Sequence, residues 1–286
     1  TVAVYGPTAD GDLDESTPHR PEGDFYAETK DEAERIVLDL AGKGDLAGSV
    51  IQPTVVYGPF APAWTVRILN ELKTGREILV DGGHGLCNVV YVDDIVRGLR
   101  LAATEDGALG EEFLISGPEP VTWKEFYAGY EHMLGFENHV EMSAADAHAL
   151  FQRLYGKKRL IREGLSVVRD TPELRRRLKA TGEAQAFLKA AKMVMPSRIR
   201  RKIKSKVTGR NLDPVQAAPK KAEPPIHPLP PAGVDLARAK TRVRIDKARR
   251  LLGYEPRFDW DAGLERVEAW ARWAGILPSR EAVEIG

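Results

Sequence analysis

A tyrosine and a lysine lie four residues apart in the stretch "DFYAETKDEAERIV", as Tyr26 and Lys30. On a helix, residues at this spacing share one face, with Cβ atoms roughly 5–6 Å apart. A free tyrosine has a pKa of about 10, and an adjacent ammonium group favours the phenolate form. Such a pair can act as a general acid/base on a substrate hydroxyl. The same spacing is also typical of solvated helix faces, so the pair needs support from the rest of the chain.

Short apolar runs alternate with helical patterns between residues 1 and 142. The runs are rich in β-branched residues and bounded by Gly or Pro, which is typical of strands. Alternation of strands with helices favours a parallel sheet covered on both faces. The expected strands lie within residues 48–59, 77–83, 87–92 and 111–117, and the expected helices within 26–44, 63–75, 93–107 and 122–135.

Several residues predict where elements begin and end. The opening stretch "TVAVYG" reads as the middle of a buried strand. Thr122 and Glu125 have the spacing of a helix capping box. The remaining predicted caps are Asp93 and Asp94 for the helix within 93–107, and Asp246 and Asp261 for two later helices, the first of which ends at Gly253.

Five stretches occur in an order that resembles one known family. They are "VYG" at 4–6 with "ESTP" at 15–18 and the Tyr26–Lys30 pair, "QPTVVYGP" at 52–59, "VVYVDDIVRGL" at 89–99, "FLISGPEPVTWKEF" at 113–126 and "KARRLLGYEPRFDWDAGLERVEAW" at 247–270. The chain thereby resembles the extended short-chain dehydrogenase/reductases, the NAD-dependent epimerase/dehydratase family. The resemblance implies an α/β fold: the C-terminal part of a Rossmann-type doubly wound parallel sheet, an interleaved α/β substrate-binding region and a helical basic insertion.

The resemblance also predicts how the chain is divided. The family's Gly-rich cofactor turn at a helix N-terminus does not occur in the sequence, so we expect the C-terminal portion of a longer enzyme. The expected parts are 1–142, the second half of the NAD-binding domain with interleaved substrate-binding segments; 143–212, the basic insertion; 213–233, a Pro-rich linker; and 234–286, a further substrate-binding segment.

The catalytic residues follow from the matched motifs. A Ser or Thr four residues before the tyrosine of "VYG" corresponds to Thr1, and the catalytic tyrosine and lysine correspond to Tyr26 and Lys30. The resemblance implies that Tyr26 is the acid/base, that Lys30 favours its phenolate and holds the nicotinamide ribose, and that Thr1 hydrogen-bonds the reacting oxygen. An N-terminal threonine nucleophile is the rival interpretation of Thr1.

The matched motifs also identify the positions of this chain that correspond to the family's binding residues. The resemblance places Pro53, Thr54, Val55 and Val56, together with Tyr26 and Lys30, against NAD, with NADP left open. The family's UDP-binding arginine corresponds to Cys87, followed by Asn88. The expected substrate-binding residues are Thr1, Cys87, Asn88, Arg242 and Arg244, and no metal site is predicted.

The residues between Thr1 and "VYG" limit the reactions that the resemblance implies. Dehydratases of the family carry an acidic residue there, whereas this chain has Val2 and Ala3. The resemblance therefore implies NAD-dependent epimerisation of a nucleotide-linked sugar through a transient keto intermediate. A hydroxyl/carbonyl oxidoreductase using NAD(P) is the alternative. A non-catalytic scaffold that binds a membrane or a partner is the third interpretation.

The composition of the chain indicates its cellular compartment and its possible partners. One cysteine among 286 residues excludes an internal disulfide and fits a reducing compartment, so we expect a cytoplasmic protein. Residues 151–210 hold 19 Lys and Arg against four Asp and Glu. Their basic amphipathic patterns, above all within 184–207, fit either a helical lid on the acidic remainder or peripheral contact with an anionic membrane. Nucleic acid is not an expected partner, and a homodimer is left open.

Overall fold

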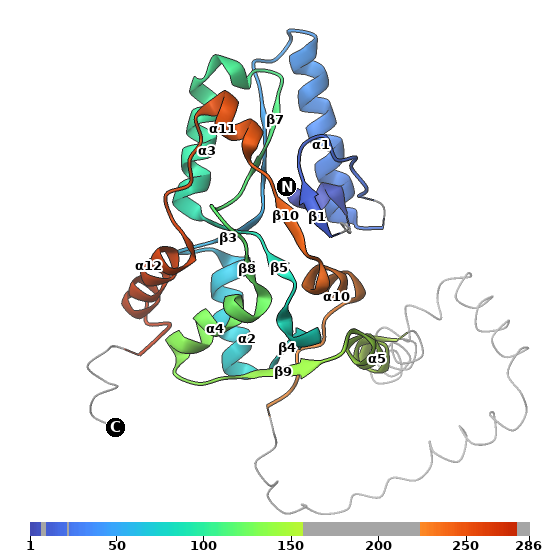
Figure 1. Cartoon of the computed structure of the whole chain (residues 1–286), viewed down its shortest axis with the longest axis vertical. Coiled ribbons are helices and arrows are strands. Elements are labelled where there is room, and N and C mark those ends of the chain that lie inside the picture. Colours follow the sequence, from blue (N-terminus) through green and yellow to red (C-terminus); the bar gives the residue numbers. More distant parts are fainter. Residues whose placement is uncertain (7–9, 22, 157–223, 279–286) are drawn as a thin grey trace, which may run out of the picture. The chain divides into compact units, whose positions relative to one another are not determined.

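The computed structural model describes residues 1–6, 10–21, 23–156 and 224–278 (Figure 1). Contacts divide the chain into one unit of Thr1–Phe151 with Pro224–Gly286 and a second of Gln152–Glu223. The helices are η1 (Val2–Tyr5), α1 (Phe25–Gly42), η2 (Pro62–Val66), α2 (Arg67–Thr74), η3 (Asp81–Gly83), α3 (Val92–Thr104), η4 (Asp106–Ala108), α4 (Trp123–Leu134), α5 (Ala144–Tyr155), α10 (Pro231–Arg238), α11 (Asp246–Leu252) and α12 (Trp260–Trp273). The strands are β1 (Gly11–Leu13), β2 (Val50–Pro53), β3 (Val55–Tyr57), β4 (Glu77–Val80), β5 (Leu86–Cys87), β6 (Val89–Tyr91), β7 (Glu112–Ile115), β8 (Val121–Thr122), β9 (His139–Met142) and β10 (Thr241–Val243).

Parallel strand pairs dominate the described residues. β2 pairs with β7 and β3 pairs with β6, so the nearly continuous β2–β3 segment changes partner at Thr54. The pairs β1–β10 and β4–β9 are also parallel, and β5–β8 is antiparallel. The α/β architecture predicted from the alternating pattern is therefore confirmed.

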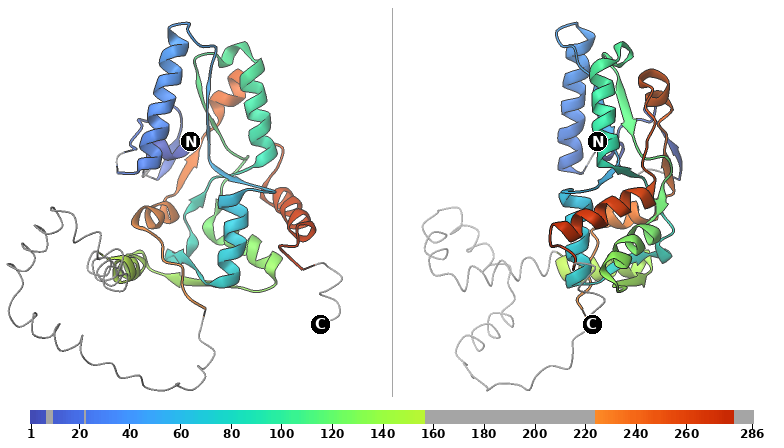
Figure 2. Two further views of the ribbon diagram at one scale, coloured as in Figure 1. Left: turned by 180° about the vertical axis from the view of Figure 1, so that it is seen from behind. Right: turned by 90° about the vertical axis from the view of Figure 1, so that its left-hand side faces the viewer.

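The β2–β7 pair has two faces of different character. In its register Val50 lies opposite Glu112 and Gln52 opposite Leu114, so Gln52 and Glu112 belong to one face. The alternate residues, Phe113 and Ile115 among them, are fully buried in a core with residues of α3 and α11. Figures 1 and 2 show α1 and α3 flanking this strand pair. The apolar side anchors the sheet, and the side toward α1 carries polar groups.

A second core joins β4 and β6 to α2, α4 and α12, and it is rich in aromatic rings. Tyr57 and Trp260 have ring centroids 4.8 Å apart, and Phe126 stacks on Trp260 at 5.3 Å. Gly263 allows this packing because any Cβ there would overlap the Tyr57 ring. This core fixes the segment after β10 against the middle of the chain.

Most predicted elements are found where the patterns placed them, including the Thr122–Glu125 capping box and the left-handed Gly253 at the end of α11. The opening strand is wrong. Residues Val2–Tyr5 form a 3₁₀ helix because the Thr1 hydroxyl caps it and Gly6 ends it in a positive-φ turn. The α12 cap is Asp259, not Asp261, and Asp246 lies in the first turn of α11 rather than capping it.

Two predictions fall partly outside the described residues. Of the basic insertion, α5 is described, whereas residues 157–223, including the amphipathic stretch 184–207, are not. The helix α10 begins at Pro231, two residues before the expected end of the Pro-rich linker, since proline is well tolerated in the first turn of a helix. Among the described residues, no helix is both long and apolar enough to span a bilayer.

Candidate active site

The Tyr26–Lys30 pair lies on the first two turns of α1, as the spacing predicts. Asp24 caps the helix by accepting hydrogen bonds from the backbone N–H groups of Tyr26 and Ala27. Tyr26 is 54 % exposed, and the Lys30 Nζ lies 5.7 Å from the centre of its ring. The phenol is thus accessible to a ligand and has an ammonium group beside it.

Thr1 lies at the start of η1, which packs against α1. The Thr1 Oγ1 accepts a hydrogen bond from the Ala3 backbone at 3.4 Å, which leaves its own hydroxyl hydrogen free to donate. Gly6 closes this turn at φ 66°, where a Cβ would overlap the Arg20 carbonyl oxygen. The "VYG" motif is therefore a turn that holds Thr1 near α1.

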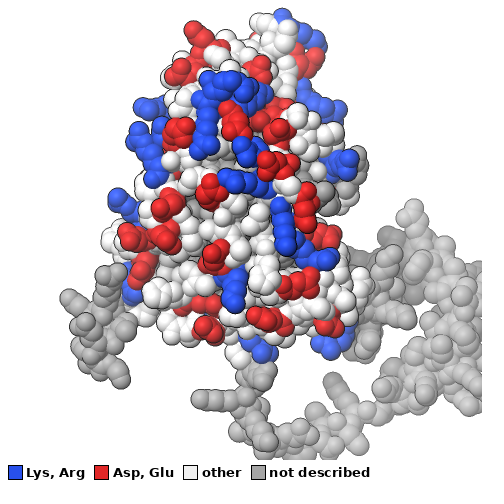
Figure 3. Space-filling view, viewed as in Figure 1, with Lys and Arg blue, Asp and Glu red and all other residues white. Residues whose placement is uncertain are grey.

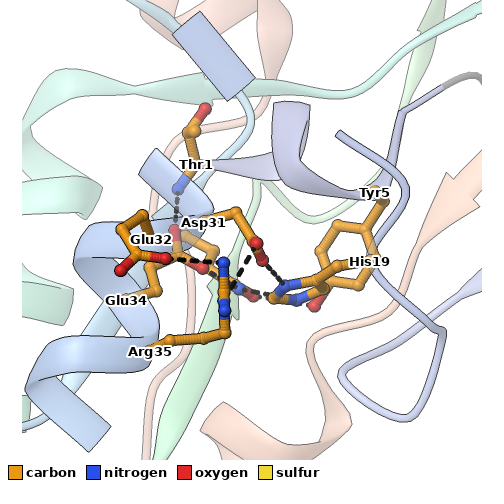
Figure 4. A network of polar contacts seen from close by, with 8 residues as sticks. Thr1, Tyr5, His19, Asp31, Glu32, Glu34 and Arg35 are labelled. Carbon is orange, nitrogen blue, oxygen red and sulfur yellow. Dashed lines mark hydrogen bonds and ion pairs between the residues drawn. The ribbon is translucent and has the colours of Figure 1, made fainter. Parts of the chain in front are cut away.

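A polar network connects η1, α1 and β2 beneath this turn (Figure 4). The Tyr5 hydroxyl donates to Gln52 Oε1 at 2.8 Å, and Gln52 Nε2 donates to Glu34 Oε2 at 2.8 Å. The Thr1 amino nitrogen lies 2.9 Å from the other Glu34 oxygen. Gln52 is fully buried, and burial together with nearby carboxylates raises the pKa of Tyr5 far above its usual value. These residues hold the helix rather than reach the solvent.

A second set of contacts adjoins the first. His19 Nδ1 lies 2.7 Å from Asp31 Oδ1, and Arg35 donates to the other Asp31 oxygen at 3.1 Å. The His19 ring meets the Tyr5 ring edge-on, with centroids 4.8 Å apart. Glu34, His19 and Asp31 were not singled out from the sequence, because they are joined to partners in separate segments.

The four residues expected against the cofactor occupy the carboxyl end of β2 and the start of β3. Thr54 is buried at the change of partner, where its hydroxyl donates to Ser116 Oγ at 3.2 Å. Ser116 was not anticipated, although it directly follows β7 at the same edge of the sheet. Carboxyl ends of parallel strands are where ligands bind in open α/β sheets, so Pro53–Val56 lie at a suitable edge.

Cys87 and Asn88 have structural roles in the described part of the chain. Cys87 is 1 % exposed within the aromatic core, and burial raises the pKa of its thiol well above the usual value. The Asn88 amide donates to the Thr241 carbonyl at 2.8 Å and accepts from the Val243 N–H at 2.9 Å. Asn88 thereby fixes β10 beside β6, and Cys87 has no surface to offer a substrate.

Arg242 and Arg244 from β10 and the segment after it border a small pocket together with Asn88, Ser116 and Arg249. Each guanidinium has a carboxylate partner: Arg242 with Glu119 at 2.7 Å, Arg244 with Asp246 at 2.9 Å and Arg249 with Glu255 at 3.2 Å. Figure 3 shows basic side chains gathered over α11 and β10 with acidic ones between them. Exposed pairs of this kind are worth little, so an anionic ligand can replace the carboxylates.

The two aspartates expected to cap α3 do not cap it, and Asp94 forms long-range hydrogen bonds instead. Asp94 is 1 % exposed and accepts hydrogen bonds from the backbone N–H groups of Arg257 and Phe258. The helix begins after Tyr91 without a side-chain cap. Asp94 therefore positions the segment that leads into α12, a long-range role that local spacing does not reveal.

Known proteins are similar in sequence to part of this chain. Residues 1–116 match the model of the NAD dependent epimerase/dehydratase family. A ketoreductase of Stigmatella aurantiaca that acts on 4-hydroxy-2-methyl-3-oxo-4-farnesyl-3,4-dihydroquinoline-1-oxide is 33% identical over 131 residues, 44% of this chain and 38% of that protein. The decarboxylating sterol-4-alpha-carboxylate 3-dehydrogenase of Mus musculus is 30% identical over 120 residues, 40% of this chain and 33% of that protein.

A solved structure extends the likeness to the fold of the whole chain. UDP-glucuronic acid 4-epimerase from Bacillus cereus, in complex with UDP-glucuronic acid and NAD, superposes with a TM-score of 0.55 at 16% identity. The match covers 96% of this chain and 60% of that one. The chain thus spans just over half the length of that enzyme and about a third of its curated relatives. Residues 1–116 thus match the model of the NAD-dependent epimerase/dehydratase family, and the chain has an α/β fold similar to that of the UDP-glucuronic acid 4-epimerase structure.

Proposed function

We propose that this chain carries the acid/base residues of an NAD-dependent enzyme that interconverts a secondary alcohol and a ketone. The observation that carries the proposal is the exposed Tyr26 phenol with the Lys30 amine 5.7 Å from its ring centre, at the start of α1. When bound, the nicotinamide supplies or accepts the hydride. Lys30 and the Pro53–Val56 segment are the residues that would hold it.

The proton is handled by side chains of this chain. In the reducing direction the Tyr26 hydroxyl gives its proton to the carbonyl oxygen as hydride reaches the carbonyl carbon, and in the oxidising direction the phenolate takes it back. The Lys30 ammonium stabilises the Tyr26 phenolate, and the Thr1 hydroxyl donates a hydrogen bond to the reacting oxygen of the substrate. NAD is the cofactor that we favour, because the similar epimerase structure holds NAD, and NADP is the alternative.

Net oxidation or reduction is the outcome that we favour. The two curated relatives cited above are named as a ketoreductase of a dihydroquinoline oxide and a sterol-4-alpha-carboxylate 3-dehydrogenase. The position where nucleotide-sugar enzymes of the family carry a UDP-binding arginine is Cys87, which is buried here. Both observations support an apolar hydroxyl or keto substrate, such as a sterol or an alkylated ring ketone.

Epimerisation of a nucleotide-linked sugar is the second candidate. The pocket bordered by Asn88, Arg242, Arg244 and Arg249 favours it, because guanidinium groups bind phosphate in paired hydrogen bonds. A homodimer is compatible with either reaction. A cytoplasmic location and peripheral membrane contact through residues 184–207 are likewise compatible with either reaction.

An absorbance assay separates the two reactions. The natural polypeptide is incubated with NAD(H) or NADP(H) and with two substrate sets, ring ketones or sterols and UDP-sugars. Net redox predicts stoichiometric change at 340 nm with a ketone. Epimerisation predicts a new sugar epimer by NMR with no net change at 340 nm. Turnover of either kind that survives Tyr26→Phe undiminished would contradict the proposal.

A further inference from the structure

Three side chains suited to metal binding converge on the α1 side of the β2–β7 pair. They are His19 from the segment before α1, Glu34 from α1 and Glu112 from β7. One potential ligand atom of each lies within 4.8 Å of those of the other two. Glu112 reaches this face because it lies opposite Val50 in the strand register, on the same side as Gln52.

The His19 ring contacts a carboxylate through Nδ1, as the rings of metal-binding histidines commonly do. Its Nδ1 lies 2.7 Å from Asp31 Oδ1, and Asp31 is itself 8 % exposed and bonded to Arg35. A carboxylate on Nδ1 fixes the ring orientation and the tautomer, so that Nε2 keeps its lone pair. His19 Nε2 lies 3.5 Å from Gln52 Nε2, an amide nitrogen that can only donate. The Nε2 lone pair faces this N–H donor, and the same amide donates to Glu34, so an ion bound by His19 and Glu34 would replace the Gln52 N–H groups as their partner.

Negative charge at this place exceeds the positive charge that contacts it. Glu112 has neither a hydrogen-bond donor nor an ion-pair partner for its carboxylate within the described ranges. The charges of Glu112, Glu15 and Glu34 all act to raise the pKa of the Tyr5 phenol between them. The Thr1 amino group contacts Glu34 at 2.9 Å, Arg35 pairs with Asp31 and Glu32, and Lys247 pairs with Glu111, so none of these three cations is paired with Glu112.

We propose that His19, Glu34 and Glu112 bind a divalent transition-metal ion of the Zn²⁺ type, with Asp31 orienting His19. One imidazole nitrogen and two carboxylate oxygens at about 2.0–2.2 Å suit Zn²⁺ and leave a fourth position for water. The imidazole ligand disfavours Ca²⁺ and Mg²⁺, which prefer oxygen donors. The ion joins three separate segments beneath the helix that carries Tyr26, so its role is to fix α1 on the sheet.

Metal titration of the full chain tests this site without any assay of turnover. Zn²⁺ is titrated into the protein in competition with a chromophoric chelator, and Co²⁺ binding is followed through its visible absorption. His19→Ala and the isosteric Glu112→Gln are expected to weaken Zn²⁺ binding by more than about 10-fold, and Asp31→Asn by about 10-fold. Glu111→Gln is the matched control, because Glu111 neighbours Glu112 but pairs with Lys247.

The thermal transition gives a second readout. Zn²⁺ is expected to raise the melting temperature of the wild type and of Glu111→Gln, and to leave that of Glu112→Gln unchanged, because ligands that bind the folded state stabilise it. Equal Zn²⁺ affinity in the wild type, His19→Ala and Glu112→Gln would overturn the proposal. A wild type that binds neither Zn²⁺ nor Co²⁺ would overturn it as well.

Discussion

The two faces of α1 differ in how they hold ionisable groups. On the outer face Tyr26 is 54 % exposed and Lys30 lies beside it. On the inner face Asp31 and Glu34 are 8 % and 7 % exposed, and each carboxylate has two partners. One helix thus separates groups that can meet a ligand from groups that attach the helix to the sheet.

The buried carboxylates of α1 need partners that its exposed side chains do not need. A buried carboxylate is stable only if it is paired and hydrogen-bonded, so the inner face needs His19, Arg35 and Gln52. An exposed phenol and amine need no such partners and remain available for chemistry. Substitutions on the outer face should therefore change activity, and substitutions on the inner face should change stability.

The largest expected effect is on the outer face. Tyr26→Phe removes the hydroxyl that we propose exchanges the proton, and should lower kcat/KM by about 10²–10⁴-fold. Because the side chain is exposed, unfolding in urea should be unaffected. The matched control is Tyr155→Phe, an exposed tyrosine outside the proposed site. A large loss of stability in Tyr26→Phe would break the distinction between the two faces.

A buried carboxylate away from α1 sharpens the comparison. Glu77 in β4 is 3 % exposed, and its Oε1 has no hydrogen-bond partner among the described residues. Burial, together with the charge of Glu71, raises the pKa of Glu77 to about 7 from 4.5. The folded protein then holds this proton more tightly than the unfolded chain does. The free energy of unfolding should therefore fall as pH rises from 4.5 to 7.

Glu77→Gln should abolish that fall. The raised pKa corresponds to a loss of up to about 3 kcal/mol above pH 7, so the variant should be more stable than the wild type at pH 8. The two proteins should approach each other in stability near pH 4.5. Urea unfolding at both pH values measures this, with Glu255→Gln as an exposed control. A wild-type-minus-variant difference independent of pH would contradict the assignment.

A smaller effect is expected from the partnered carboxylate of the inner face. Glu34→Ala leaves the buried Gln52 amide without its acceptor, which should lower the free energy of unfolding by about 2 kcal/mol. Because both Glu34 oxygens have partners in the folded state, this loss should be present at pH 7. Chemical denaturation in metal-free buffer measures it. An unchanged midpoint would show that the network does not hold α1.

The smallest effect is expected at the exposed end of α1. Lys43 and Asp39 form an i, i+4 ion pair at 2.6 Å with both side chains about 60% exposed. Lys43→Met should change the free energy of unfolding by less than about 0.5 kcal/mol and leave turnover unchanged. The same experiments used for Glu34→Ala provide the comparison. A loss larger than that of Glu34→Ala would reverse the order proposed for the two kinds of site.

What the sequence could predict follows the same division. Tyr26 and Lys30 lie within one helix, so their spacing predicts that they share a face, and the matched motifs then identify them as a candidate acid/base pair. Gln52 is 47 residues from its partner Tyr5 and 18 from Glu34, and no local pattern links them. The three proposed metal ligands likewise come from separate segments, and the histidines showed no ligand spacing. The Cys87 position was judged by motif alone, which does not tell which face of a short strand is buried.

Deuterium transfer tests the central claim most directly. The natural polypeptide is mixed with 4-deuterated NADH or NADPH and a ring ketone, and the product alcohol is analysed by mass spectrometry after a single turnover. We expect one deuterium on the carbinol carbon in the wild type and in Lys43→Met, and a transfer rate at least about 100-fold lower in Tyr26→Phe. Deuterium transfer at the wild-type rate in Tyr26→Phe would contradict the claim.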